Sequence, residues 1–571
     1  MLARILGICS ISAALAAPAA AQSADSVHYS VAPVMRDSAL AALTVEMRFS
    51  GDADGETQLY LPGEWAGSDS LWHQLDSLTV RGATAVRDSG EESRILTHAP
   101  GAPLVVRYRV TTAYAGEPGF GWQKARPIVH PDWFFFHGEG VFAVPAGRDQ
   151  SPAGFAWGAF PAGWRMASDL DHIHDGSRPG VVNDVIESAT LGGADLRVTE
   201  RMVDGAPLRV AVQGSWPFEA DAFADAVARI IHAENAFWGD GGRPFVVQLA
   251  PLGGMGTGYS FSGTARSDAF SVASTPNFPL AEAQRFLAHE YMHTWIAREV
   301  GGPSADEASG FWLSEGFTDF YAGRVLLRAG LWTPADFVAE VNRTLLRNAS
   351  SPARLATSAE VAAKFWTDAN VRQLPYDRGH LLGLLLDDRI RRHTGGRADL
   401  DDVLREMRVT ARQLAERGTG TDAETLFSAV LMRRFDMDVL GALALHLDGG
   451  EPVVLPADLY GTCARVETAT QPDFSRGFDA GATTAAGNVV TGVDPAGPAY
   501  AAGMRDGMRL LRREAGQPGD GSVELAYRVD DGGTERVIRY LPAGRGTVEF
   551  QRVVLTPEAT SARCVALMSG A

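Results

Sequence analysis

The residue pattern changes twice along this 571-residue chain, and these changes limit the folds it can adopt. From about residue 25 to 215, short β-rich runs such as LTVEMRFS are separated by Gly, Pro and Asp turns. Between about 218 and 450 apolar residues recur at helical spacing, and β-type runs such as NVVTGVDP, VELAYRVD, ERVIRYLP and VEFQRVVL follow after 465. A chain of this length exceeds one hydrophobic core. We therefore predict a multidomain α+β protein with an N-terminal β-sandwich-like domain.

The first residues have the pattern of a secretory signal peptide. MLARILGICSISAALAAPAAAQ combines Arg4, an apolar run, and a small-residue cleavage site at Ala19 to Ala21. No later run approaches 18 uninterrupted apolar residues, so we expect no membrane span. The sequence thus predicts a signal peptide over 1–21 and a secreted protein, with the bacterial periplasm as its compartment.

Charge and cysteine content restrict the partners and the compartment further. The net charge of -18 argues against binding to nucleic acid, which needs a basic surface. Apart from Cys9 in the signal peptide, the chain holds Cys463 and Cys564. In an oxidising compartment these two favour a disulfide that joins the ends of the C-terminal region, and a pair of buried free thiols is the alternative.

An H-E-x-x-H run, residues 289 to 293, lies within a helical pattern that extends to Gly301 and Gly302. Residues four apart share one face of a helix, so His289 and His293 can hold one metal ion while Glu290 projects beside them as general base. The spacing predicts a helix with two zinc ligands.

A second segment, FWLSEGFTDFY, supplies the remaining parts of a catalytic zinc site. Glu315 on this segment completes a His₂Glu set that leaves one coordination position open, the arrangement of catalytic zinc. Asp319 follows one helical turn later and is expected to accept the second ring N–H of His289. We expect one Zn²⁺ per chain, although a surface role for Asp319 is an alternative.

The expected chemistry is hydrolysis by an activated water. Zinc acidifies its water and polarises a carbonyl, and Glu290 carries the proton to the leaving amine. The candidate donor to the developing oxyanion is Tyr376, placed just before the apolar run LLGLLLDDRIRRHTGG. His380 is the rival for this role, and a merely packed Tyr376 is the alternative.

The segments HEYMHTW, WLSEGFTDFYAGRVLLRAGL and PYDRGHLLGLLLDDRIRRHTGGRADLDDVL resemble the glycyl aminopeptidase family. That resemblance implies a thermolysin-like zinc peptidase acting on peptides, with a mostly helical catalytic domain and a C-terminal PDZ domain. It carries over His289, His293 and Glu315 as ligands, Glu290 as base and Tyr376 as transition-state donor. The expected boundaries are 22–217 for the β-rich domain, 218–455 for the catalytic domain and 456–571 for the PDZ-like domain, which has a peptide as its expected ligand.

One stretch departs from the family. The family's Gly-Gly-Leu-Glu-His type strand, whose Glu binds the substrate's α-amine, here has Gly253, Gly254 and Met255 followed by Gly256. Asp268 or Glu282 is a candidate replacement anchor. The Gly-rich stretch 253–263 is expected to be an edge strand that pairs with extended substrate, as a hypothesis.

The leading prediction is an aminopeptidase. The missing anchor leaves an endopeptidase as the second reading, and a non-catalytic PDZ scaffold is the alternative from another class. The presence of Glu290 argues against the scaffold, because a structural zinc site has no use for a base.

Overall fold

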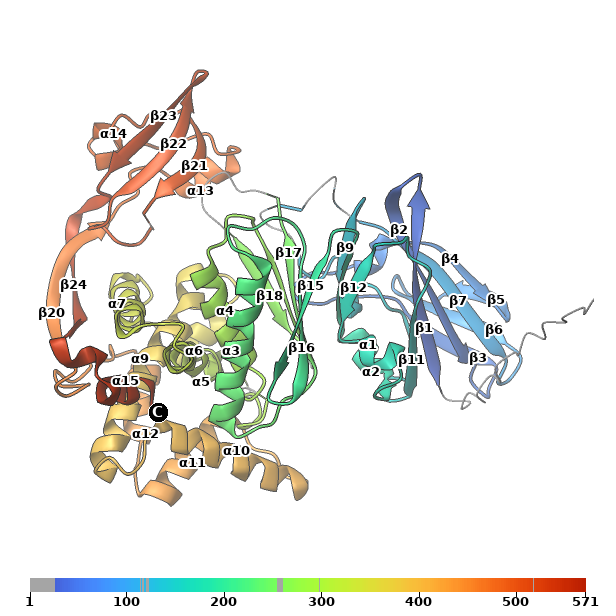
Figure 1. The fold of residues 1–571 in the computed structure, drawn as a ribbon, viewed down its shortest axis with the longest axis horizontal. Helices are drawn as coiled ribbons and strands as arrows, with labels where there is room; N and C mark the ends of the chain where they lie inside the picture. The colour runs from blue at the N-terminus through green and yellow to red at the C-terminus, as the bar shows by residue number, and fades with distance from the viewer. Residues whose placement is uncertain are drawn as a thin grey trace, which may run out of the picture.

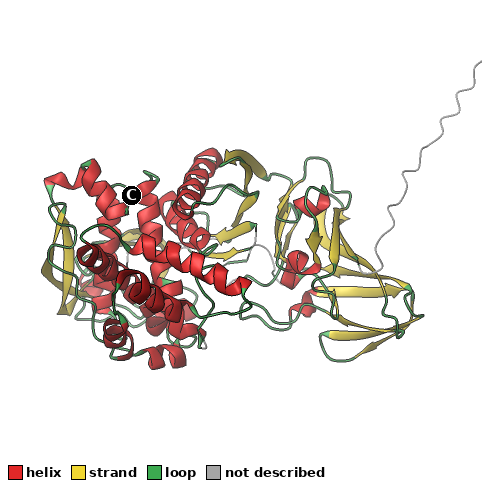
Figure 2. Cartoon of the chain, turned by 90° about the horizontal axis from the view of Figure 1, so that it is seen from below, coloured by secondary structure: helices red, strands yellow, loops and turns green. Residues whose placement is uncertain are grey.

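A computed structural model describes residues 26–570 except 113, 115–117, 120–122, 254–259, 267, 297, 305 and 517. The predicted signal peptide therefore lies outside the described residues. Strands gather at the N-terminal end of the molecule and helices at the other end, as Figure 2 shows. This is the multidomain α+β arrangement expected from the sequence. Among the described residues no helix is long and apolar enough to cross a membrane.

The N-terminal region is β-rich, as predicted. Two of its sheets have the orders β13-β11-β1-β2-β7-β4 and β10-β3-β6-β5, and a third has the order β12-β14-β9-β8. Alternating residues of these strands are buried in one apolar core that includes Val45, Tyr108 and Phe136. The strands are β1 Val27–Arg36, β2 Ala39–Ser50, β3 Glu56–Tyr60, β4 Leu75–Arg81, β5 Ala83–Asp88, β6 Ser93–His98, β7 Pro103–Val110, β8 Ile128–His130, β9 Trp133–His137, β10 Val144–Pro145, β11 Pro152–Trp157, β12 Arg165–Ser168, β13 Gly180–Val181 and β14 Ala189–Gly193. Short helices α1 Asp171–His174 and α2 Val182–Ile186 lie beside β11.

A mixed sheet of order β15-β16-β17-β19-β18 lies between the β-rich region and the helices (Figure 1). Its strands are β15 Arg197–Val203, β16 Ala206–Val212, β17 Phe245–Pro251, β18 Phe261–Ala265 and β19 Ala269–Ser274. The predicted boundary at residue 217 falls after β16, which pairs in parallel with β17 of the same sheet. Strand β18, from the Gly-rich stretch, is an edge strand of this sheet.

The helical half has one large apolar core, built from helix faces and one face of the mixed sheet. Its helices are α3 Ala220–Trp238, α4 Leu280–Met292, α5 Phe311–Ser314, α6 Gly316–Arg328, α7 Pro334–Ser350, α8 Ser358–Lys364, α9 Ala369–Thr394, α10 Leu400–Glu416, α11 Ala423–Phe435 and α12 Leu440–Leu443. Capping residues fix several starts: the Thr333 hydroxyl accepts the N–H of Asp336, and the Asp368 carboxylate accepts that of Asn370. Because of the Asp368 cap, α9 begins before Tyr376 rather than after it, and Pro375 lies inside the helix.

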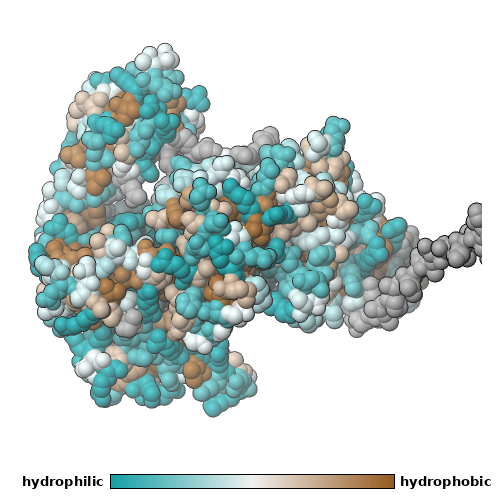
Figure 3. All heavy atoms as spheres, viewed as in Figure 1, coloured by the Kyte–Doolittle hydropathy of each residue, from teal (hydrophilic) through white to brown (hydrophobic). Residues whose placement is uncertain are grey.

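The C-terminal region has two parts. The long antiparallel strands β20 Ala464–Phe474 and β24 Ala543–Leu555 curve past α7 toward a separate lobe, and α15 Ala562–Ser569 lies against α6 (Figure 1). The lobe holds β21 Arg509–Ala515, β22 Leu525–Asp531 and β23 Thr534–Tyr540 with short helices α13 Ala480–Ala485 and α14 Pro498–Ala501, around its own core. Figure 3 shows a hollow between this lobe and the helical half.

Two local expectations for this region meet different outcomes. Cys463 and Cys564 form a disulfide that joins the start of β20 to α15, with Cα atoms 5.5 Å apart. The expected strand NVVTGVDP is wrong: Val489 makes only an isolated bridge to Arg509, and Gly492 at φ 71° turns the chain.

Candidate metal centre

Helix α4 presents its two histidines to one point. His289 lies in its last turn, and His293 directly follows its final residue Met292. The helix ends there, in contrast to the predicted helical run to Gly301, and His293 keeps helical backbone angles as its C-cap. The two Nε2 atoms are therefore 3.2 Å apart.

Glu315 reaches the same point from the junction between α5 and α6. Its Oε2 lies 3.2 Å from Nε2 of His289 and 3.5 Å from Nε2 of His293. The three ligand atoms fall within 4.8 Å of one another, a spacing that can hold a metal ion. Among the described residues this is the group of three or more His, Cys, Asp or Glu side chains with that geometry. The predicted ligand set is thus brought together in the fold.

Asp319 lies on the first turn of α6 and holds the other nitrogen of His289. The Nδ1 of His289 donates a hydrogen bond to Asp319 across 2.9 Å. This leaves its Nε2 directed at the ligand atoms of His293 and Glu315. Arg285, missed by the sequence analysis, donates to the same carboxylate from 3.3 Å. Its spacing of four residues before His289 on a predicted helix is the signal that locates it.

The charges of this cluster depend strongly on one another. Burial lowers the pKa of His289, but hydrogen bonds to Asp319 and Glu315 outweigh burial and raise it to about 10. Burial raises the pKa of Glu315, yet His293 and His289 hold it well below its usual value. The two carboxylates therefore stay ionised beside the imidazoles, and a bound cation takes the place of the imidazolium proton.

Two further side chains belong to the site, Glu290 from helix α4 and Tyr376 from helix α9. Glu290 is half-buried beside the ligands on α4, and Tyr376 on α9 stacks on His289 with ring centroids 6.2 Å apart. Burial and the nearby carboxylates, Glu315 first, raise the pKa of Tyr376, so its phenol keeps the proton it would donate. His380, the rival donor, is 2% exposed and packs edge-on against Phe320.

The candidate substrate strand is only partly described. Gly254 and Met255 lie outside the described residues, whereas the backbone N–H of Gly253 donates to the carbonyl of Pro118 across 2.8 Å. Both candidate amine anchors already have cationic partners. Asp268 pairs with Arg178, and Glu282 lies 3.8 Å from Arg285 and 3.6 Å from Arg343.

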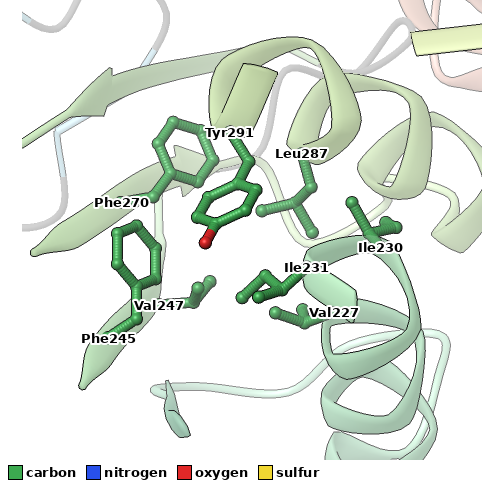
Figure 4. Close-up of a pocket in the computed structure, with 8 residues that line it drawn as sticks. All are labelled: Val227, Ile230, Ile231, Phe245, Val247, Phe270, Leu287 and Tyr291. Carbon is green, nitrogen blue, oxygen red and sulfur yellow. The ribbon is translucent and has the colours of Figure 1, made fainter. Parts of the chain in front are cut away.

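The opposite face of α4 borders a small cavity, which Figure 4 shows. Leu287 and Tyr291 line it together with residues of α3 and the mixed sheet. Its lining is apolar apart from the Tyr291 hydroxyl, which donates to Asn235 across 3.1 Å. This cavity is a packing defect behind the helix and not the site.

The site indicates the class of the protein, and a family model matches the segment that carries the site. Converging His, His and Glu side chains beside a further carboxylate, that of Glu290, are the arrangement of a metallopeptidase. Residues 282–378, which carry all of these groups, match the family model of the M61 glycyl aminopeptidases. The chain is a metallopeptidase, and its segment 282–378 is similar to the M61 glycyl aminopeptidases.

One solved structure supports the fold. The aminopeptidase N family protein from Idiomarina loihiensis aligns with a TM-score of 0.67 at 15% identity, over 95% of this chain and 100% of that chain. An M1 zinc metallopeptidase from Deinococcus radiodurans aligns with a TM-score of 0.41 at 16% identity, over 75% of this chain and 94% of that chain. Among curated proteins, no sequence matches this chain.

Proposed function

We propose that the chain is a zinc-dependent peptidase in which His289, His293 and Glu315 hold one Zn²⁺. The observation that carries the proposal is the convergence of two imidazole nitrogens and one carboxylate oxygen within 4.8 Å. This donor set suits zinc better than magnesium or calcium, which prefer oxygen ligands. Zinc supplies an acidified water and polarises the scissile carbonyl when it is bound.

The remaining steps belong to side chains. Glu290 takes the proton of the attacking water and delivers it to the amine that leaves. Tyr376 donates its phenolic hydrogen to the oxygen on which charge develops, and its high pKa keeps that hydrogen in place. Asp319 fixes the tautomer of His289. Replacing Tyr376 with Phe should lower kcat about 100-fold with little change in KM.

We propose aminopeptidase activity first, because the matching family model is that of glycyl aminopeptidases. An endopeptidase is the second reading, favoured by one observation: Asp268 and Glu282 are already paired with arginines. A substrate ammonium without an anionic partner is costly to bind away from water.

Matched peptides with free and acetylated N-termini distinguish these readings. We expect the wild type to release single N-terminal residues from the free peptides alone, and the Glu290→Gln variant to release none. Internal cuts that ignore acetylation would make the enzyme an endopeptidase. Equal cleavage by wild type and variant would contradict the peptidase mechanism.

For the C-terminal lobe we propose a PDZ-like peptide-binding role. The antiparallel β21-β22-β23 sheet leaves β21 and β23 as edges, and a peptide can add to an exposed edge as a further strand. Calorimetric titration with peptides ending in a free carboxylate tests the role, and heats of dilution alone would contradict it.

We also propose export to the periplasm. The Cys463 to Cys564 disulfide supports it, because such bonds persist in oxidising compartments. N-terminal sequencing of the protein purified from its source should begin near Gln22, and a retained Met1 would contradict export.

A further inference from the structure

Two cations outside the metal centre lie against the indole ring of Trp65. The Nζ of Lys124 is 5.9 Å from the ring centroid, and the guanidinium of Arg266 is 4.4 Å from it. Trp65 and Lys124 belong to the β-rich region, whereas Arg266 directly follows β18, the edge strand of the mixed sheet. The Lys124/Arg266 pair therefore lies where the two halves of the molecule meet.

The ammonium of Lys124 makes no ion pair with any described carboxylate. Its side chain is half-buried, and no carboxylate within ion-pair distance is found for it among the described residues. Its largest charge interaction is with Glu290, followed by those with Arg266 and Glu139. Burial lowers the pKa of Lys124 and the charge of Glu290 acts against it, so the two side chains are near enough for their charges to interact.

Arg266 is paired incompletely. Its side chain is 8% exposed, and its Nη2 donates to Glu139 across 2.8 Å. Its Nε is buried and has no hydrogen-bond partner in the described part of the chain. Arg266 therefore has one ion-pair partner among the described residues, Glu139, and its buried Nε–H is left over.

His137 holds Lys124 in place without adding charge. One ring nitrogen lies 2.9 Å from the carbonyl oxygen of Lys124, and the other lies 2.7 Å from the hydroxyl of Ser271 on β19. Burial lowers the pKa of His137 well below its usual value, so the ring is neutral. The backbone of Lys124 is thereby fixed against the mixed sheet.

We propose that the Lys124/Arg266 pair binds a carboxylate of the peptide substrate beside the scissile bond. The proposal rests on the proposed peptidase function and adds a substrate class to it, namely peptides with an acidic side chain or a nearby C-terminus. A half-buried ammonium and a buried unpaired N–H both gain from an incoming anion, because charge-assisted hydrogen bonds are the strong ones. The same cations disfavour a substrate ammonium at this position.

Alanine-based peptides with Glu or Gln at a single position provide the first test. We expect the wild type to cleave one Glu peptide at least about 10-fold more efficiently, in kcat/KM, than its Gln partner. A second pair, ending in a carboxylate or a carboxamide, separates the acidic side chain from the C-terminus as the source of the anion.

The chain's two lysines, Lys124 and Lys364, give a matched pair of variants. Lys124→Met should bring the acid-to-amide ratio of kcat/KM close to one, and Lys124→Arg should restore most of it. Lys364→Met is the control, since Lys364 is exposed on α8 and lies 3.8 Å from Glu360. A wild-type ratio near one would overturn the proposal, and so would an equal loss on both peptides in Lys124→Met.

Binding measured without turnover separates this proposal from the peptidase mechanism. In the Glu290→Gln background, the acidic peptide should bind at least about 10-fold more tightly than its amide partner, and adding Lys124→Met should abolish the difference. Equal affinities would overturn the anion site even if the wild type hydrolyses peptides. A preference for acid without hydrolysis by the wild type would overturn the peptidase function alone.

Discussion

Helix α6 takes part in two buried clusters of charge that differ in their arrangement. At its start, Glu315 and Asp319 meet His289 and His293, and three donor atoms converge on one point. Two turns later Arg324 lies 3.1 Å from Asp387 and 3.2 Å from Asp401, so opposite charges neutralise each other. We call this second set, with Arg328, the α6 arginine cluster.

The difference shows how a metal-binding cluster can be distinguished from a structural ion-pair cluster. In the metal centre, three atoms with lone pairs face one another. A cation between them, a metal ion or a proton, is needed to satisfy all three. In the α6 arginine cluster each charge already faces its opposite, and the Tyr321 hydroxyl adds a hydrogen bond to Asp401 across 3.0 Å. Loss of one partner should therefore affect activity in the first cluster and stability in the second.

The largest expected effect is that of His293→Ala. We expect kcat/KM to fall more than about 1000-fold, because the metal supplies several kcal/mol of transition-state stabilisation. Unfolding of the metal-free variant in urea should change by less than about 1 kcal/mol relative to the metal-free wild type, because His289 still pairs with Glu315 when His293 is lost. A stability loss of several kcal/mol would erase the contrast between the clusters.

Arg324→Met should show the reverse. It leaves Asp387 and Asp401 buried without this cation, so we expect the free energy of unfolding to fall by about 3 to 5 kcal/mol. Arg539→Met, at an exposed ion pair with Glu524, should cost less than about 1 kcal/mol. Metal content should match the wild type in both, and metal loss in folded Arg324→Met would contradict the separation.

Asp319→Asn tests the position between the clusters. The amide still fits beside His289 but loses the charge that orients the imidazole, so metal affinity should fall about 10- to 100-fold. Competition with a chromogenic chelator measures the change. Unchanged affinity would make Asp319 a structural residue.

A carboxylate of the β-rich region, Asp169, extends the comparison of charged clusters to the pH dependence of stability. Burial raises its pKa to about 8, although the N–H of Ala189 donates to it across 3.0 Å. Because this value exceeds that of the unfolded chain, the wild type has its full stability below about pH 4 and loses it as the pH rises through 8. Asp169→Asn should melt a few degrees higher at pH 9 and at nearly the same temperature at pH 4, by calorimetry. A difference independent of pH would contradict this assignment.

Local patterns in the sequence located most of the metal centre. Helical periodicity placed His289 and His293 on one face, and spacing along the next helical segment located Glu315 and Asp319. The end of α4 at Met292 was missed, because apolar spacing continues to Val300 although the backbone turns earlier. The early start of α9 was missed because the helix was expected from the apolar run that follows Tyr376, while the Asp368 cap starts it at Ala369.

Contacts between segments far apart in the chain could not be predicted from the sequence. Nothing in the segment around Lys124 indicates that it meets Arg266, since the pairing depends on how the β-rich region packs on the mixed sheet. The parallel pairing of β16 with β17 likewise depends on tertiary packing. Short-range periodicity carries no information on such contacts.

The central claim is that His289, His293 and Glu315 hold the zinc on which Glu290 acts. The most direct test measures zinc content and peptide hydrolysis on the same preparations of the wild type, Glu290→Gln and Glu315→Gln. We predict about one zinc per chain in the wild type and in Glu290→Gln, little in Glu315→Gln, and hydrolysis by the wild type alone. Full zinc in Glu315→Gln, or wild-type hydrolysis by Glu290→Gln, would contradict the account.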